Sequence, residues 1–173
     1  ITPATIVDCS HLFKKNGAVS YDGFHGRHYG MLALGGLLTL GALFEAMERL
    51  GNLPKQLRRI LIALYDKPAG GFRPIAIFVS FYRLWTRCRA SERRAWEAQF
   101  ARRYFANATG ASVEDTVWRQ AVQNEREGSI SGEAAAMLAD MEAFYECIDL
   151  ELLRTKAKKL NVPGVFVKLS LQA

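Results

Sequence analysis

The sequence has few of the residues on which disulfide-stapled or disordered chains depend. Its 173 residues include three cysteines, an odd number, and no internal repeat or low-complexity tract. Half of the residues are hydrophobic, which excludes a disordered tail, a collagen-like repeat and a disulfide scaffold. The widely separated Cys9, Cys88 and Cys147 instead indicate a reducing compartment or buried thiols.

A secretory signal and a long apolar run are also missing. The chain does not open on a basic start followed by an apolar core, so an intracellular protein is expected, in a compartment that the sequence does not specify. The longest uncharged stretch, Tyr29–Phe44, is shorter than the ~20 residues that a bilayer core requires. Its glycines permit close helix packing in lipid or in a soluble core. We expect a buried helix, with membrane contact as the less favoured alternative.

Acidic residues are outnumbered by basic ones, 17 to 23, which gives a formal net charge of +6. This excess favours an anionic partner such as nucleic acid or an acidic membrane surface. A nucleic-acid surface and a solvated helix face both remain open for the basic segment 83–103, in which aromatic residues interleave with arginines. The arginines of this segment are Arg83, Arg87, Arg89, Arg93, Arg94, Arg102 and Arg103.

The order of apolar runs and turn signals predicts a predominantly helical α+β fold with a small β-hairpin. A helix is expected from about 30 to 50, because Gly51 and Pro54 follow it. The run 57–64 fits a helix or a strand, but a glycine turn and the apolar run 75–79 follow it and favour a hairpin near 60–79. Further expectations are an irregular segment at 1–28, a loop at 128–132, and helices at 80–105, 112–126, 149–160 and after Pro163.

Two cations bracket the glycine turn of this predicted hairpin. Lys67 precedes the turn and Arg73 follows it. Fixed cations at such a tip can close over a triphosphate, because they neutralise its charge while backbone amides approach closely. A surface hairpin with two solvated charges is the alternative.

One carboxylate lies where an apolar stretch ends. Asp140 follows the small apolar residues 134–139, a position that is unfavourable unless a cation uses the carboxylate. A hard cation such as Mg²⁺ would suit it, and Tyr145 lies five residues further on. Alternatively, Asp140 caps a helix over 141–147.

Several segments together resemble the reverse transcriptases of non-LTR retroelements. DMEAFYECIDLELL (140–153) is similar to their first catalytic motif, and KPAGGFRPIAIFVSFYRLWTR (67–87) to the preceding finger motifs. DGFHGRHYG, ERLGNLP and GASVEDTVWRQAV resemble further segments of the family, in the family's order. The resemblance covers roughly residues 21–163 and is more specific than any single motif.

The resemblance implies a right-hand polymerase fold and a role for each matching residue. Asp140 and the Met141 carbonyl would bind Mg²⁺, and Tyr145 would sense the 2′ position of the incoming nucleotide. Lys67 and Arg73 would hold its triphosphate, and Arg83, Arg87, Arg93 and Arg94 would lie near an RNA or DNA template–primer. The implied reaction is nucleotidyl transfer with two metal ions. The implied organisation is an N-terminal segment 1–28, fingers over 29–132 and the start of the palm over 133–173.

One required motif does not occur. The family completes its metal site with an aromatic-x-Asp-Asp motif, and these 173 residues contain no Asp-Asp pair. We therefore expect a fingers-plus-partial-palm fragment that is inactive alone. The alternative from another class is a non-catalytic structural subunit of a larger, membrane-associated or soluble, protein assembly.

Overall fold

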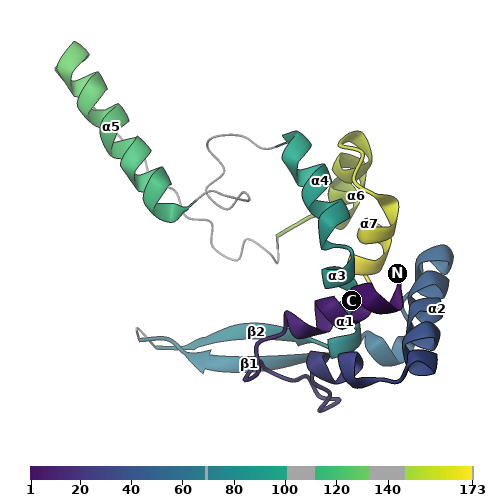
Figure 1. The fold of residues 1–173 in the computed structure, drawn as a ribbon. Helices are drawn as coiled ribbons and strands as arrows, with labels where there is room; N and C mark the ends of the chain where they lie inside the picture. The colour runs from purple at the N-terminus through teal and green to yellow at the C-terminus, as the bar shows by residue number, and fades with distance from the viewer. Residues whose placement is uncertain (69, 101–111, 133–146, 173) are drawn as a thin grey trace. The chain divides into compact units, whose positions relative to one another are not determined.

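The computed structural model describes four stretches of the chain: residues 1–68, 70–100, 112–132 and 147–172. They fall into two compact units, each described by itself: unit 1 is Ile1–Ser91 with Ala157–Ala173, and unit 2 is Glu92–Lys156. The described residues are mostly helical and contain one two-stranded antiparallel hairpin (Figure 1). The prediction of a predominantly helical α+β protein with a small hairpin is therefore confirmed.

Helix α2 (Leu34–Leu50) forms one wall of the core of unit 1. Apolar residues three or four positions apart share one side of a helix, and this side is buried. The helix ends where predicted, at Gly51, whose φ of 58° suits glycine. No helix in the described parts of the chain is both long and apolar enough to cross a membrane. The buried side chains of α2 are Leu37, Leu40, Phe44 and Met47.

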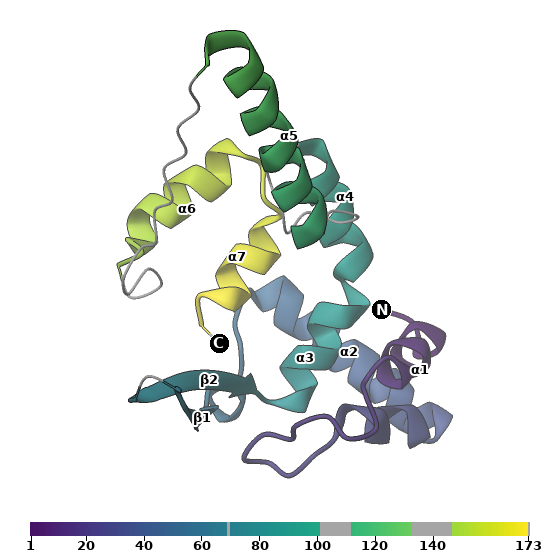
Figure 2. The ribbon, with the colours of Figure 1, turned by 90° about the vertical axis from the view of Figure 1, so that its left-hand side faces the viewer.

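Helices α3 (Ser80–Cys88) and α7 (Gly164–Ser170) complete this core from distant parts of the sequence. The rings of Trp85 and Phe166 lie 5.9 Å apart, and the Tyr82 hydroxyl lies 3.1 Å from Ser170 Oγ. Figure 2 shows α7 beside the end of α2. Residues late in the chain thus belong to the same hydrophobic core as the N-terminal helices.

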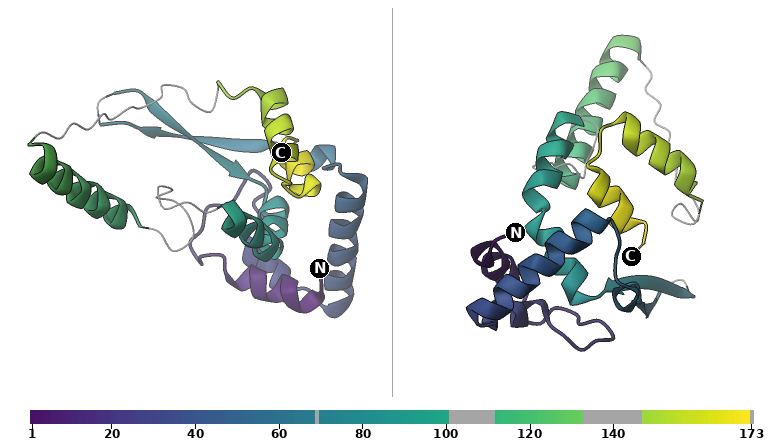
Figure 3. Two further views of the ribbon diagram at one scale, coloured as in Figure 1. Left: turned by 90° about the horizontal axis from the view of Figure 1, so that it is seen from above. Right: turned by 90° about the vertical axis from the view of Figure 1, so that its right-hand side faces the viewer.

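Helix α1 (Pro3–His11) lies in the segment that we expected to be irregular, so that expectation is wrong for these residues. The Thr2 side chain accepts a hydrogen bond from the Thr5 N–H, and Pro3 occupies the first helical turn. The helix packs against α2, α3 and η1 (Gly26–Met31), as Figure 3 shows. A helix this short depends on such packing, because it gains little from propensity.

The hairpin consists of β1 (Ile60–Asp66) and β2 (Phe72–Phe78), preceded by η2 (Lys55–Leu57). The structure therefore resolves the open choice at 57–64 in favour of a strand from Ile60. The two strands pair antiparallel with Asp66 opposite Phe72. Most of their side chains are exposed, and the hairpin extends away from α1 and α2 (Figure 1).

The remaining helices agree with the predictions in part. The stretch expected to be helical over 80–105 is divided at Arg89 into α3 and α4. The loop expected at 128–132 is wrong, because α5 continues to Ser131 and ends at Gly132, whose φ is 76°. The helix predicted at 149–160 is confirmed as α6. The bounds are Ala90–Phe100 for α4, Val113–Ser131 for α5 and Leu150–Lys159 for α6.

The three cysteines occupy different environments. Cys9 and Cys88 are buried in the core of unit 1, whereas Cys147 is exposed. Burial, and then the neighbouring Cys9 thiol, raise the pKa of Cys88 to about 12. The Cys88 thiol is therefore protonated and packs as a small apolar side chain.

Candidate functional site

The turn of the hairpin fixes the position of Lys67. The Lys67 N–H donates to the Gly71 carbonyl at 2.9 Å, and the Gly70 N–H donates to the Lys67 carbonyl at 3.0 Å. Both glycines have positive φ, 87° at Gly70 and 81° at Gly71, a conformation that other residues rarely adopt. Because the residue paired with Lys67 is a glycine, no side chain stands opposite the lysine.

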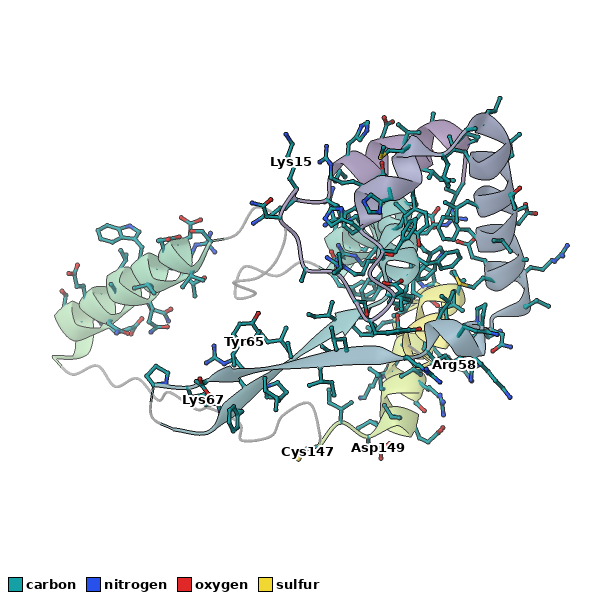
Figure 4. The ribbon with its side chains drawn as sticks, turned by 90° about the horizontal axis from the view of Figure 1, so that it is seen from below. Lys15, Arg58, Tyr65, Lys67, Cys147 and Asp149 are labelled. Carbon is teal, nitrogen blue, oxygen red and sulfur yellow. The ribbon has the colours of Figure 1, made fainter. Side chains whose placement is uncertain are left out.

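The strand register places the second cation on the same face as the first. Arg73 pairs directly with Tyr65, and Lys67 lies two positions after Tyr65. Side chains two positions apart on one strand point to the same face, as do directly paired residues. Lys67, Arg73 and Tyr65 therefore share one face of the hairpin near its tip, and Figure 4 labels Tyr65 and Lys67 there.

These two cations have no acidic partner among the described residues. Both side chains are exposed, and neither takes part in a salt bridge within the described stretches. Asp66 lies next to Lys67 in the sequence, but the alternation of the strand directs it to the other face. Two adjacent positive charges repel each other, and a multiply charged anion relieves this repulsion. The tip is thus suited to bind phosphate groups.

Pro74 is compatible with this strand. The Lys67–Gly71 hydrogen bond sets the alternation of the ladder, which makes Leu64–Pro74 a pair without backbone hydrogen bonds. Proline has no N–H, so at this position no ladder hydrogen bond is lost. The segment from Arg73 to Ile75 therefore forms a regular strand in spite of its proline.

A second basic region lies on α3. Arg83 and Arg87 are one helical turn apart, and their guanidinium carbons lie 5.3 and 4.2 Å from the centroid of the Phe13 ring. The Arg83 guanidinium also donates to the Ala18 carbonyl at 2.7 Å. Burial, and then the nearby charge of Arg87, lower the pKa of Arg83, while Asp22 raises it. The two arginines thus stabilise the N-terminal loop (residues 12–25, between α1 and η1). Both side chains remain partly accessible to an anion.

The other arginines of the sequence cluster differ in their partners. Arg89 forms a bidentate pair with Glu48, with N–O distances of 2.7 and 2.5 Å. Arg93 pairs with Glu97 one turn further along α4, and Arg94 is exposed. The cluster is divided between the two units, with Arg83 and Arg87 in unit 1 and Arg93 and Arg94 in unit 2.

Sequence reasoning missed the basic residues that the N-terminal loop brings close to Phe13. Arg27 donates to the His11 and Phe13 carbonyls at 3.0 and 2.9 Å. Lys14 and Lys15 follow Phe13 and are exposed, and Figure 4 labels Lys15 on this loop. The adjacent lysines after an aromatic residue were a visible signal in the sequence. The contact of Phe13 with Arg83 and Arg87 depends on the fold.

No protein-family model matches the sequence, and no curated protein matches it.

The predicted palm residues Asp140, Met141 and Tyr145 lie outside the described residues. Of the neighbouring motif, Asp149 is described and caps α6, because its carboxylate accepts from the Glu151 and Leu152 N–H groups at 2.8 and 3.0 Å. Within the described stretches, no three His, Cys, Asp or Glu residues form a group that could hold a metal ion.

Proposed function

We propose that this chain is the fingers and the first part of the palm of an RNA-directed DNA polymerase of the non-LTR retroelement type. On this proposal the 173 residues bind a nucleoside triphosphate and an RNA or DNA template–primer but do not catalyse nucleotidyl transfer alone. The observation that carries the proposal is the hairpin, which presents Lys67 and Arg73 on one face without an acidic partner among the described residues.

The hairpin residues would neutralise the triphosphate. A lysine ammonium is a compact charge, and an arginine guanidinium offers a planar fork of donors that matches phosphate oxygens. Mg²⁺ at Asp140 and the Met141 carbonyl would supply further charge neutralisation, and Tyr145 would sense the 2′ position of the nucleotide. These three roles rest on the sequence resemblance alone.

The arginines of α3 and α4 would bind the template–primer backbone. Arg83 and Arg87 are partly exposed and held by Phe13, whereas Arg94 is exposed on α4. Each phosphate contact by such a residue releases counterions, so binding of this kind weakens with salt. Arg93 shares its charge with Glu97 and is expected to contribute least.

Binding of a labelled RNA–DNA primer–template, measured over a range of salt concentrations, tests the nucleic-acid part of the proposal. The double variant Arg87→Gln/Arg94→Gln should reduce the slope of log affinity against log salt by about 2, because each lost phosphate contact removes about 1. The control Lys158→Gln/Lys159→Gln removes two exposed charges from α6 and should leave the slope unchanged. Absence of salt-dependent binding by the unsubstituted chain would contradict this part.

A subunit of a larger protein assembly is the second candidate. Leu34 and Leu38, one helical turn apart on the outward side of α2, are both more than half exposed. Contiguous exposed apolar residues of this kind are typical of surfaces that contact another protein. If this candidate holds, Leu38→Glu should release the chain from its native complex without affecting nucleotide binding.

A further inference from the structure

The two faces of the hairpin differ in chemistry. The cationic face carries Tyr65, Lys67 and Arg73 near the tip, and the opposite face carries Leu64, Asp66 and Phe72. Each face has one exposed aromatic ring near the turn, Tyr65 with 57% and Phe72 with 60% of its surface exposed. The two rings are therefore similar in exposure, and only Tyr65 lies beside the cations.

Tyr65 lies beside both cations, and its hydroxyl and its ring are available to contact a ligand. It is paired directly with Arg73, which places the two Cβ atoms about 5 Å apart, and Lys67 follows about 7 Å along the strand. The structure gives its hydroxyl no hydrogen bond with any described residue and its ring no aromatic neighbour there. An exposed ring beside two cations can stack on a base or sugar while the cations bind phosphate.

We infer that Tyr65 is a specificity-determining residue that contacts the nucleoside part of the ligand whose triphosphate lies on Lys67 and Arg73. This inference rests on the nucleotide site proposed above and adds a residue to it. Tyr65 then allows the site to distinguish a nucleoside triphosphate from an inorganic polyphosphate. The two cations alone cannot make this distinction, because they interact only with the phosphate charge.

A purely structural role for Tyr65 makes a different prediction. An arginine often stacks on a neighbouring aromatic ring, and Tyr65 would then only orient the Arg73 guanidinium. Loss of the ring would in that case weaken every phosphate ligand equally. Comparison of a nucleoside triphosphate with inorganic tripolyphosphate therefore distinguishes ligand contact from the orientation of Arg73.

The experiment measures dissociation constants of both ligands for the full chain by titration calorimetry. Tyr65→Ala should raise the dissociation constant of the nucleoside triphosphate about tenfold, the effect of one lost stacking contact, and leave that of tripolyphosphate within about twofold. Tyr65→Phe keeps the ring and should bind as the unsubstituted chain does. Phe72→Ala, the matched control on the opposite face, should leave both constants unchanged and shows whether loosening of the hairpin affects binding.

The outcomes separate this inference from the proposed function. If the unsubstituted chain binds the nucleoside triphosphate but Tyr65→Ala weakens both ligands equally, or neither, the role of Tyr65 is overturned and the nucleotide site stands. If Phe72→Ala has the same effect as Tyr65→Ala, the role of Tyr65 is likewise overturned. If the unsubstituted chain binds neither ligand, the proposed nucleotide site is overturned together with the inference.

Discussion

The helical core of unit 1 and the hairpin of the same unit differ in how far they bury their apolar side chains. Phe44, Leu84 and Trp85 are almost completely buried, and residues as distant in sequence as Leu169 complete the same cluster. The hairpin has apolar residues on both faces and buries few of them. An isolated two-stranded hairpin is only marginally stable in water. The described core thus buries its apolar side chains within unit 1, whereas the hairpin leaves most of its apolar side chains exposed.

Removal of the Phe44 ring from the core should cause the largest loss of stability. Phe44→Ala should lower the free energy of unfolding by about 3–5 kcal/mol, because the ring is fully buried and leaves a cavity. Denaturant unfolding followed by Trp85 fluorescence, with Trp96 and Trp118 replaced by phenylalanine, measures it. Leu38→Ala, from the exposed side of the same helix, should cost much less. Equal losses for the two variants would contradict the assignment of the core.

The polar contacts of the core should respond to pH. Burial raises the pKa of Glu48, but hydrogen bonds from Arg89 and Trp85 outweigh it and lower the pKa below its ordinary value of 4.5. This contribution to stability is therefore present above pH 4.5 and is lost as the pH falls through the lowered pKa. Glu48→Gln should cost about 2–3 kcal/mol at pH 7, because the Arg89 charge loses its partner.

Denaturation of the Glu48→Gln variant and the unsubstituted chain across the acidic range tests this expectation. The unsubstituted chain should lose stability more steeply below pH 4.5 than the variant does. Glu45→Gln, at a neighbouring and exposed glutamate of α2, is the control and should change neither stability nor its pH dependence. Parallel pH profiles for the Glu48→Gln variant and the unsubstituted chain would show that Glu48 contributes nothing.

A change on the hairpin should have the smallest effect. Ile62→Ser replaces an apolar residue that is 60% exposed and should change the free energy of unfolding by no more than about 0.5 kcal/mol. The same denaturant titration measures it. A loss larger than about 1 kcal/mol would show that this face of the hairpin is packed in the folded chain, which would remove the contrast with the core.

Local signals in the sequence predicted the elements with clear boundaries. Gly51 ends α2 and Gly70–Gly71 closes the hairpin, because positive φ values are readily adopted by glycine. The short helix α1 was not predicted, because it has nine residues and depends on packing against α2 and α3. The loop expected at 128–132 was wrong, because only the second of its two glycines ends the helix.

The candidate site, too, could be predicted from the sequence only in part. The residues Lys67 and Arg73, and the turn between them, follow from the sequence alone, as does the predominance of arginine after the hairpin. Only the strand register shows that both cations and Tyr65 share a face. Only the tertiary structure decides that Arg89 is neutralised by Glu48, 41 positions earlier, while Arg83 and Arg87 lie against Phe13. The reason is physical: backbone preferences act between neighbours in sequence, whereas the partner of a charge is set by which helices pack together.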